Sequence, residues 1–166
     1  LNNINYSILR LSNVYGENHS KLNQTNRQIL SKIIKFALKY KKIDVYGHGK
    51  YFRDYVHVKD VCEAIYKVLR TKKSKNQIFN IASGHKIQLI CMFKLIKKII
   101  YENYGYSVTL NRVKIDNNKI NYIRNYQASI NKARKLLKWK TNIELKSGVT
   151  DLINFIYNKE IKNFNN

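Results

Sequence analysis

One short stretch combines a flexible turn with a fixed positive charge. Gly47 and Gly49 are separated by one residue, and Arg53 follows where an alternating run of apolar and polar residues begins. Glycine lets the backbone turn at positive φ, and the planar guanidinium of arginine presents five N–H donors to phosphate or carboxylate oxygens. The spacing therefore indicates an anion site suited to a diphosphate. An ordinary hairpin with a surface arginine is the alternative.

Two asparagines lie at or near the ends of predicted buried strands. Asn13 follows the apolar run 6–11, and Asn80 lies in the run 77–81, which leads into the turn 82–84. Ligands of open α/β sheets bind beyond the carboxyl ends of the strands, so the Asn13 amide is placed where it can reach a bound group. A turn-forming asparagine is the local alternative at this position.

The elements that must position these residues are predicted from hydrophobic periodicity. The expected helices span residues 26–40, 59–70, 89–104 and 144–158, with a shorter helix within 128–139, and the expected strands span 6–11, 43–46, 77–81 and 107–113.

Individual residues set the expected ends of these helices. Asn26 is a candidate N-cap, and Asp60 is placed either to cap the second helix or to favour its positive end. Gln88 precedes the third helix, where glutamine is a weak N-cap, and Gly105 is placed to end the same helix. Trp139 is expected to pack into the core beside the short helix.

The titratable side chains are predicted to be structural. His57 lies near Asp54 and Asp60 in the sequence, but alternation puts His57 and Asp54 on opposite faces of the strand. We therefore expect a structural histidine rather than a general base. Cys62 and Cys91 lie on apolar helix faces and are expected to be buried small hydrophobes rather than metal ligands or a disulfide.

Composition allows a folded domain and gives weak evidence of a partner. The chain has 166 residues, of which 44% are hydrophobic, enough to bury a core. The net charge of +22 raises nucleic acid as a partner, but the basic residues are scattered and form no long block. No apolar run approaches the length of a membrane span. A basic nucleic-acid-binding module therefore stays an alternative, and no membrane association is expected.

Four segments together resemble one protein family. The first is Tyr46-Gly47-x-Gly49 followed by Arg53-Asp54-Tyr55-Val56-His57-Val58-x-Asp60, which is similar to the substrate-binding segment of the NAD-dependent epimerase/dehydratase family, the extended short-chain dehydrogenases that act on nucleotide sugars. The others follow the family's order: Arg10-x-x-Asn13-Val14-Tyr15-Gly16, Phe79-Asn80-Ile81-Ala82-Ser83-Gly84, and the run 128–139 that ends in Trp139.

The resemblance implies roles for individual residues. Arg53 would grip the diphosphate of a nucleotide sugar, and Asn13 and Asn80 would orient it. Tyr46 would line the nucleotide pocket, and Lys119 lies near the position of a second family arginine, although a lysine cannot make the paired contact. At the end of the first strand, Leu11 and Ser12 are the implied cofactor contacts.

The resemblance also implies the fold class and domain organisation. We expect an α/β chain in which residues 1–166 form the C-terminal part of a Rossmann-type parallel sheet and the small α/β substrate-binding domain. The sequence contains no Gly-x-x-Gly-x-x-Gly turn, and no Tyr-x-x-x-Lys precedes the first strand. We therefore expect the N-terminal NAD-binding half to be absent and assign no catalytic residue; a gene fragment without function is a further alternative.

The implied function is nucleotide-sugar binding within an NAD-dependent epimerase or dehydratase similar to UDP-glucose 4-epimerase or dTDP-glucose 4,6-dehydratase. NAD would serve the complete enzyme and is not expected to bind this chain alone. The expected partners are a nucleotide-diphosphate sugar, a separately encoded N-terminal half and a second subunit, in the cytoplasm. Without the N-terminal half, the first strand should have an unpaired edge and an exposed apolar face, leaving the isolated chain poorly soluble or partly molten.

Overall fold

A computed structural model of the chain describes residues 4–17, 28–114 and 125–162. The strands are β1 (Ser7–Leu11), β2 (Asn13–Tyr15), β3 (Lys42–Tyr46), β4 (Phe52–Arg53), β5 (Tyr55–His57), β6 (Gln77–Ile81), β7 (Ile87–Gln88) and β8 (Thr109–Val113). The helices are α1 (Ile29–Tyr40), α2 (Val58–Arg70), α3 (Leu89–Tyr104), α5 (Asn131–Leu137) and α6 (Leu145–Ile156), with a 3₁₀ turn η2 (Lys72–Ser74) and a π-helical turn η3 (Tyr157–Ile161).

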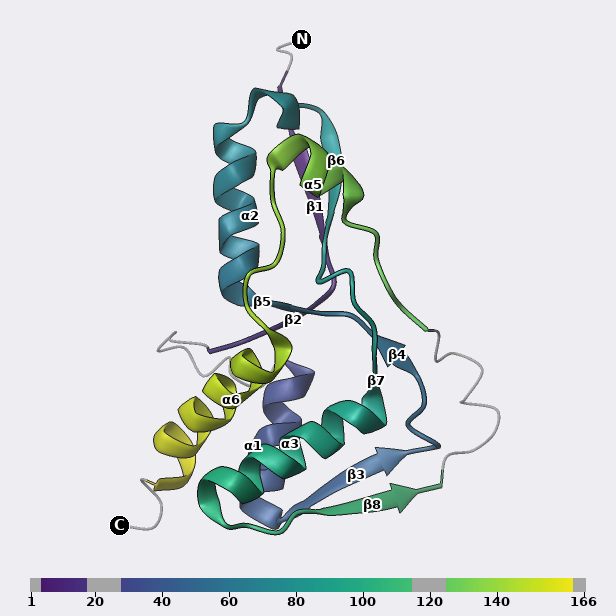
Figure 1. The fold of residues 1–166 in the computed structure, drawn as a ribbon, viewed down its shortest axis with the longest axis vertical. Coiled ribbons are helices and arrows are strands. Elements are labelled where there is room, and N and C mark those ends of the chain that lie inside the picture. Colours follow the sequence, from purple (N-terminus) through teal and green to yellow (C-terminus); the bar gives the residue numbers. More distant parts are fainter. Residues whose placement is uncertain (1–3, 18–27, 115–124, 163–166) are drawn as a thin grey trace.

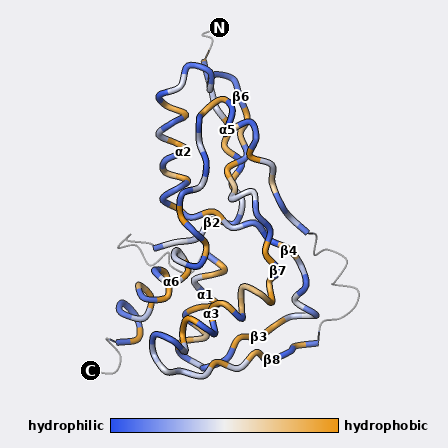
Figure 2. Tube along the Cα trace, viewed as in Figure 1, coloured by the Kyte–Doolittle hydropathy of each residue, from blue (hydrophilic) through white to orange (hydrophobic). Residues whose placement is uncertain are grey.

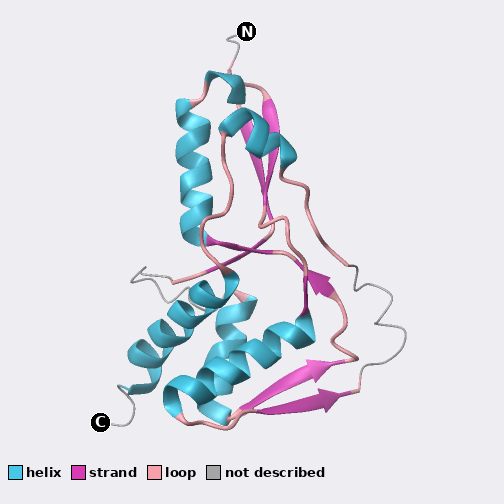
Figure 3. Ribbon diagram, viewed as in Figure 1, coloured by secondary structure: helices cyan, strands magenta, loops and turns pink. Residues whose placement is uncertain are grey.

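These elements form two lobes joined by short strands (Figure 1). The upper lobe in that view holds β1, β6, α2 and α5, and the lower lobe holds α1, α3, α6, β3 and β8. The short strands β2, β4, β5 and β7 run between the lobes (Figure 3). The two lobes correspond to the expected strands of a Rossmann-type sheet and the expected small α/β domain.

The strand pairs are mostly parallel, as an α/β fold requires. β1 pairs with β6, β2 with β5, and β3 with β8, all in parallel, whereas β4 and β7 are antiparallel. A parallel pair needs a long crossover between its strands, and here the chain from β1 to β6 includes α1 and α2. The register brings Arg10 opposite Asn80 and Asn13 opposite Tyr55.

Each lobe has its own core. In the lower lobe Ile34 of α1, Met92 of α3 and Leu152 of α6 are buried together. In the upper lobe Phe79 of β6 packs with Trp139, whose side chain has no exposed surface, so the expectation of a core tryptophan is confirmed. Figure 2 shows apolar and polar residues alternating along the helices, as expected for helices with one buried face.

Local sequence signals predicted most helix ends. α3 has the predicted bounds, Gly105 ends it at a φ of 70°, and Gln88 stands at its start without a side-chain cap. α1 begins at Ile29 with Gln28 at the N-cap position, whereas Asn26 lies outside the described residues. The cap of α2 is His57, whose side chain accepts a hydrogen bond from the Lys59 backbone.

The outer side of α2 corrects one set of predictions. Cys62 was expected to be buried but is exposed, and so are Ile65 (45% exposed) and Leu69 (79%) from the same apolar stripe. The inward side of α2 is narrower than the stripe, because Val61 and Ala64 alone supply its buried apolar residues.

The prediction for the second cysteine is also wrong. Cys91, in the first turn of α3, is exposed, and its thiol lies 3.8 Å from the side-chain oxygen of Gln88. The neighbouring Met92 and Phe93 take the buried positions at this point of the helix.

β1 has an open edge, as predicted. Among the described strands it pairs with β6 and with no other. Ile8 of β1 is 45% exposed, and Ile78 of β6, which is opposite Ile8 on the same face, is 37% exposed, whereas Leu11, also 45% exposed, lies on the other face at the end of the strand. The exposed apolar face predicted for this strand is therefore present.

Candidate diphosphate and nucleotide site

The glycine turn is built as its residue types indicate. Gly47 and Gly49 adopt φ values of 65° and 64°, and a Cβ atom at Gly49 would lie 3.0 Å from a methyl group of Val45 and 3.2 Å from the Cβ of Ile90. The Gly49 carbonyl accepts a 2.9 Å hydrogen bond from the Ile90 N–H. The turn is therefore packed against the first residues of α3, and a side chain at position 49 would press on Val45 and Ile90.

Arg53 lies at the end of β4, between the two lobes. Its strand pairs with β7, which leads directly into α3, and its Nη1 donates a 2.8 Å hydrogen bond to the Phe52 carbonyl. The side chain is half-buried. This bond holds one nitrogen of the guanidinium against its own strand.

Asn13 lies immediately beside this strand. Its backbone N–H and its side-chain Nδ2 both donate to the Asp54 carbonyl, at 3.1 and 2.8 Å. Because Asp54 follows Arg53 in the chain, the structure brings the predicted asparagine and the predicted arginine to the same point between the lobes. This juxtaposition comes from the parallel pairing of β2 with β5.

The side chain of Asp54 organises this region and was not recognised as important from the sequence. Its carboxylate has no exposed surface and accepts hydrogen bonds from the Ser83 N–H and hydroxyl, both at 2.8 Å, and from the Gly84 N–H at 3.1 Å. Ser12 Oγ and the Ala128 N–H lie at 3.5 Å. One buried carboxylate therefore ties together the segments that follow β1 and β6 and the segment that precedes α5.

Asn80 belongs to the upper lobe. It is opposite Arg10 in the β1–β6 register, and its Nδ2 donates a 3.2 Å hydrogen bond to the Ser129 carbonyl. Ser129 precedes α5. Asn80 therefore holds the segment before α5 against β6. It lies three residues before Ser83, which donates to the Asp54 carboxylate.

Tyr46 ends β3 at the edge of an open, mainly apolar hollow of about 500 Å³ in the lower lobe. The side chain of Tyr46 is 57% exposed. The other residues around the hollow come from α1, β3 and the start of α3: Ile29, Lys32, Ile33, Phe36, Ile43, Asp44, Leu89 and Phe93. Leu89 directly follows β7, the partner of the Arg53 strand, so the hollow and the arginine are joined by one short segment.

The remaining predicted site residues divide into two groups. Leu11 ends β1 and is exposed, and Ser12 follows it, with its N–H bonded to the Ile81 carbonyl at 3.0 Å. Lys119 lies outside the described residues.

His57 is buried at the start of α2 and fills a structural position. Its Nδ1 accepts from the Lys59 N–H at 3.2 Å, which places the proton of the neutral ring on Nε2. Burial lowers the pKa of this imidazole, and the nearby Lys59 charge acts in the same direction. The ring also meets Tyr15 edge-on, with 5.1 Å between centroids.

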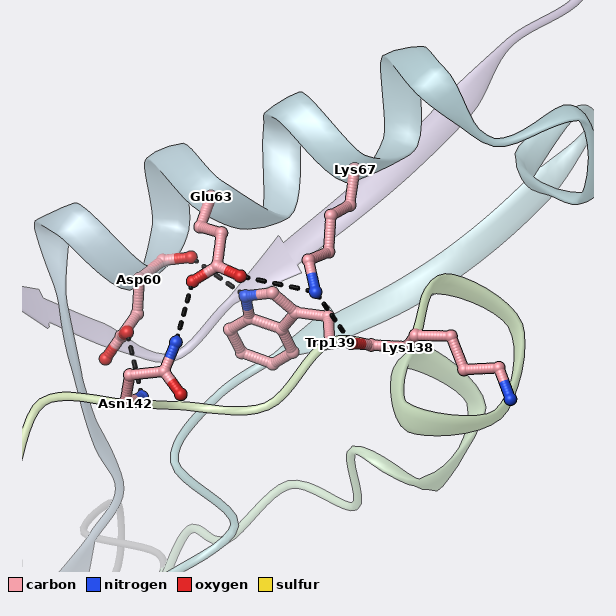
Figure 4. Close-up of polar contacts among 6 residues, drawn as sticks. All are labelled: Asp60, Glu63, Lys67, Lys138, Trp139 and Asn142. Carbon is pink, nitrogen blue, oxygen red and sulfur yellow. Dashed lines mark hydrogen bonds and ion pairs between the residues drawn. The ribbon is translucent and has the colours of Figure 1, made fainter.

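Asp60 does not cap α2 but lies in its first turn, where its charge favours the positive helix end, the second of the two expected roles. Its buried carboxylate accepts from the Asn142 N–H at 3.0 Å and the Ile143 N–H at 3.3 Å, while its carbonyl accepts from the Trp139 indole at 3.0 Å. Figure 4 shows this cluster, in which Glu63 accepts from the Asn142 side chain. The cluster holds the segment leading into α6 against α2, so Asp60 links the two lobes.

A second hollow, of about 530 Å³, lies beside this link and is lined by residues such as Tyr15, Tyr55, His57, His85 and Glu144. Burial raises the pKa of Tyr15 well above its usual value, and the negative charges of Asp60 and Asp151 add to that effect. The phenol therefore stays protonated at neutral pH.

Two further searches concern the described residues alone. In that part of the chain no group of three His, Cys, Asp or Glu side chains is arranged to hold a metal ion. None of the helices there is both long and apolar enough to span a membrane.

Fold and site together define the class of protein as an α/β chain that carries strands of a Rossmann-type sheet and a small lobe with an arginine-bearing strand. Residues 1–82 match the model of the NAD dependent epimerase/dehydratase family. These residues therefore belong to that family, and the chain corresponds to the C-terminal portion of its members.

Curated relatives and solved structures agree with this assignment. A Methanocaldococcus jannaschii protein named "Putative UDP-glucose 4-epimerase" is 32% identical, with 93% of this chain and 47% of that protein aligned. The dTDP-L-rhamnose 4-epimerase of Burkholderia thailandensis is 29% identical over 90% of this chain and 39% of its own length. The UDP-glucose 4-epimerase of Thermotoga maritima, solved with UDP-glucose, superposes with a TM-score of 0.77 at 24% identity, covering 93% of this chain and 47% of that chain. The chain thus spans about half the length of the relatives that it matches.

Proposed function

We propose that this chain is the nucleotide-sugar-binding portion of an NAD-dependent sugar epimerase or dehydratase. The single observation that carries the proposal is the position of Arg53 beside Asn13, on a strand whose partner leads into the apolar hollow at Tyr46. In this reading the diphosphate lies at the arginine and the nucleotide base lies in the hollow.

The charge and geometry of the site suit a diphosphate. Arg53 brings a permanent positive charge to a half-buried strand end, and the guanidinium matches two phosphate oxygens at once. The Nδ2 of Asn13 bonds the Asp54 carbonyl, which fixes the side-chain amide against the residue that follows Arg53. A hydrogen bond between charged partners contributes about 1.5–3 kcal/mol.

The hollow supplies an apolar surface for the base. Its walls include Ile33, Phe36 and Leu89, and Tyr46 stands at its mouth with an exposed ring. A flat base gains contact area on such a surface, and a few polar groups suffice to orient it. Asp44 is one such group, although its carboxylate already accepts a 2.9 Å hydrogen bond from Asn111.

The described residues fit NAD poorly by themselves. The Ser12 hydroxyl lies 3.5 Å from the Asp54 carboxylate, and the Ser12 N–H is bonded to the Ile81 carbonyl. Of the two predicted cofactor contacts, this leaves the exposed side chain of Leu11 to meet NAD. NAD supplies hydride chemistry to the complete enzyme. We assign its pyrophosphate and the proton-transfer residues to a second α/β half, and Leu11 and Ser12 to the boundary with that half.

Calorimetric titration of the purified chain with UDP-glucose, dTDP-glucose and UMP tests the proposal. We expect saturable binding of a diphosphate sugar, and Arg53→Ala should weaken it about tenfold to a hundredfold. Arg70→Ala is the matched control, because it removes the same charge from the exposed end of α2 in the other lobe. A folded chain that binds none of these ligands, or binds them equally well with both substitutions, would contradict the proposal.

A further inference from the structure

We infer that the basic tip of the upper lobe is a binding surface for the phosphate backbone of nucleic acid. The basic tip consists of exposed lysines from the turn η2, from the residue that follows it and from helix α5: Lys72, Lys73, Lys75, Lys132 and Lys135. This function goes beyond nucleotide-sugar binding and uses a different part of the chain.

The fold gathers lysines that are far apart in the sequence. Residues 64–101 and 117–143 contain no aspartate or glutamate, and η2 lies in the first of these segments and α5 in the second. The structure packs α5 against η2, α2 and β6 at one end of the upper lobe (Figure 1). Two segments without carboxylates therefore form one surface, although the basic residues are scattered along the chain.

The lysines of the basic tip take part in none of the ion pairs between described residues. The acidic residues of the adjacent helix α2 are engaged elsewhere. Asp60 is buried and bonds the backbone of the segment before α6, and Glu63 pairs with Lys67 and accepts from the Asn142 side chain. The positive charges of the tip therefore attract a partner that carries a row of negative charges.

The residue types at the tip suit a chain of phosphates. The exposed residues of η2 and α5 are lysine, arginine and asparagine. These side chains donate hydrogen bonds to phosphate oxygens, and a lysine ammonium does so as a point charge without reading the bases. Neither element exposes an apolar side chain of the kind that inserts into a lipid surface. The chemistry of the tip therefore favours nucleic acid over an anionic membrane.

The basic tip and the proposed diphosphate site lie at opposite ends of β1. At the start of this strand, Ser7 Oγ donates a 2.7 Å hydrogen bond to the carbonyl of Ser74 in η2. Beyond its other end, Ser12 Oγ lies 3.5 Å from the Asp54 carboxylate. The strand has five residues and is about 16 Å long. A nucleic acid bound at the tip therefore leaves the diphosphate site free.

Fluorescence anisotropy of a labelled single-stranded RNA of about 20 nucleotides, titrated with the chain at several salt concentrations, tests the inference. We expect a Kd of about 1–100 μM at physiological salt. The double variant Lys72→Gln, Lys73→Gln should weaken binding about tenfold at low salt. It should also reduce the slope of log K against log salt by about 1.4, since each phosphate contact in a single strand contributes about 0.7.

The matched control is the double variant Lys94→Gln, Lys97→Gln. It removes the same charge from exposed positions of α3 in the other lobe, and it should change the affinity less than about twofold. Equal loss of affinity in the two double variants overturns the inference, because net charge alone would then determine binding. Circular dichroism checks that each variant folds.

A DNA strand of the same sequence and vesicles containing an anionic lipid identify the partner. Binding of either nucleic acid that the Lys72→Gln, Lys73→Gln variant loses supports the inference. A folded chain that binds neither nucleic acid overturns it, as does tighter binding to the vesicles than to both nucleic acids. UDP-glucose binding by this variant should equal that of the parent chain, so the two functions are tested independently.

Discussion

Replacing Asp54 by asparagine should destabilise the whole chain, although the two side chains have nearly the same shape. The Asp54 carboxylate is fully buried and accepts from the Ser83 N–H and hydroxyl through one oxygen, and from the Gly84 N–H through the other. An asparagine keeps one oxygen and presents an NH₂ group in place of the second. Whichever orientation it takes, a buried backbone N–H then faces another donor.

The size of the effect follows from these contacts. Leaving a buried donor without an acceptor costs about 1–3 kcal/mol, and bonds that lose their charged partner weaken further. If the amide keeps its oxygen on the Ser83 side, the Gly84 N–H loses its acceptor and the longer contact to the Ala128 N–H is lost with it. We expect a loss of about 3 kcal/mol in the free energy of unfolding, or a fall in Tm of about 6–12 °C for a chain of this length.

Urea unfolding monitored by tryptophan fluorescence measures this loss, because the chain has a single tryptophan and its side chain is fully buried. Asp44→Asn is the matched control: Asp44 is half-buried and its carboxylate bonds one side chain, that of Asn111, so the cost should stay below about 1 kcal/mol. Equal stability of the two variants would refute the idea that the Asp54 carboxylate joins the segments around it.

Two further predictions concern the backbone turn and the buried histidine. Gly49→Ala should lower the free energy of unfolding, measured in urea, by about 1 kcal/mol or more beyond the loss caused by Gly105→Ala. Both positions have positive φ, but only the Cβ at position 49 would crowd its neighbours. Equal losses would show that the contact with Val45 is unimportant. The pKa of His57 in the folded chain is below its ordinary value, so the unfolded chain binds the proton more readily. The contribution of neutral His57 to stability is therefore complete above about pH 6.5 and is lost as the pH falls through the folded-state pKa. His57→Asn keeps a capping side chain without titration, and urea midpoints from pH 8 to pH 5 should fall less steeply for that variant than for the parent; identical slopes would assign the acid sensitivity to other groups.

Local patterns predicted the elements well where the signal is confined to neighbouring residues. α3 and β6 have the predicted bounds, and Gly105 ends its helix as expected. Periodicity of apolar residues and a glycine after the last turn are short-range signals, and the packing of the lower lobe agrees with them. The same reasoning located the turn at Gly47 and Gly49.

The roles of the buried carboxylates could not be read from the sequence. Asp60 lies in the first turn of α2, as one expectation had it, but its carboxylate also bonds the backbone of Asn142, 82 residues later. Asp54 bonds the N–H groups of Ser83 and Ala128, at separations of 29 and 74 residues. Such contacts depend on which segments the fold brings together, and no local periodicity reports them.

The apolar residues of α2 that are exposed disagree with the periodicity for a different reason. Cys62, Ile65 and Leu69 lie at helical spacing on α2, and each is exposed, whereas the apolar side chains of α1, α3 and α6 are largely buried. A wide apolar stripe persists on a helix when all of it is covered in the working protein, because exposed apolar residues favour aggregation. The disagreement between periodicity and burial involves several residues on α2 and one, Cys91, on α3, and on α2 it is accompanied by the open edge of β1 in the same lobe. The exposed residues that periodicity places on α2 therefore mark a surface of the upper lobe, beside the open edge of β1, that is more apolar than the burial within this chain requires.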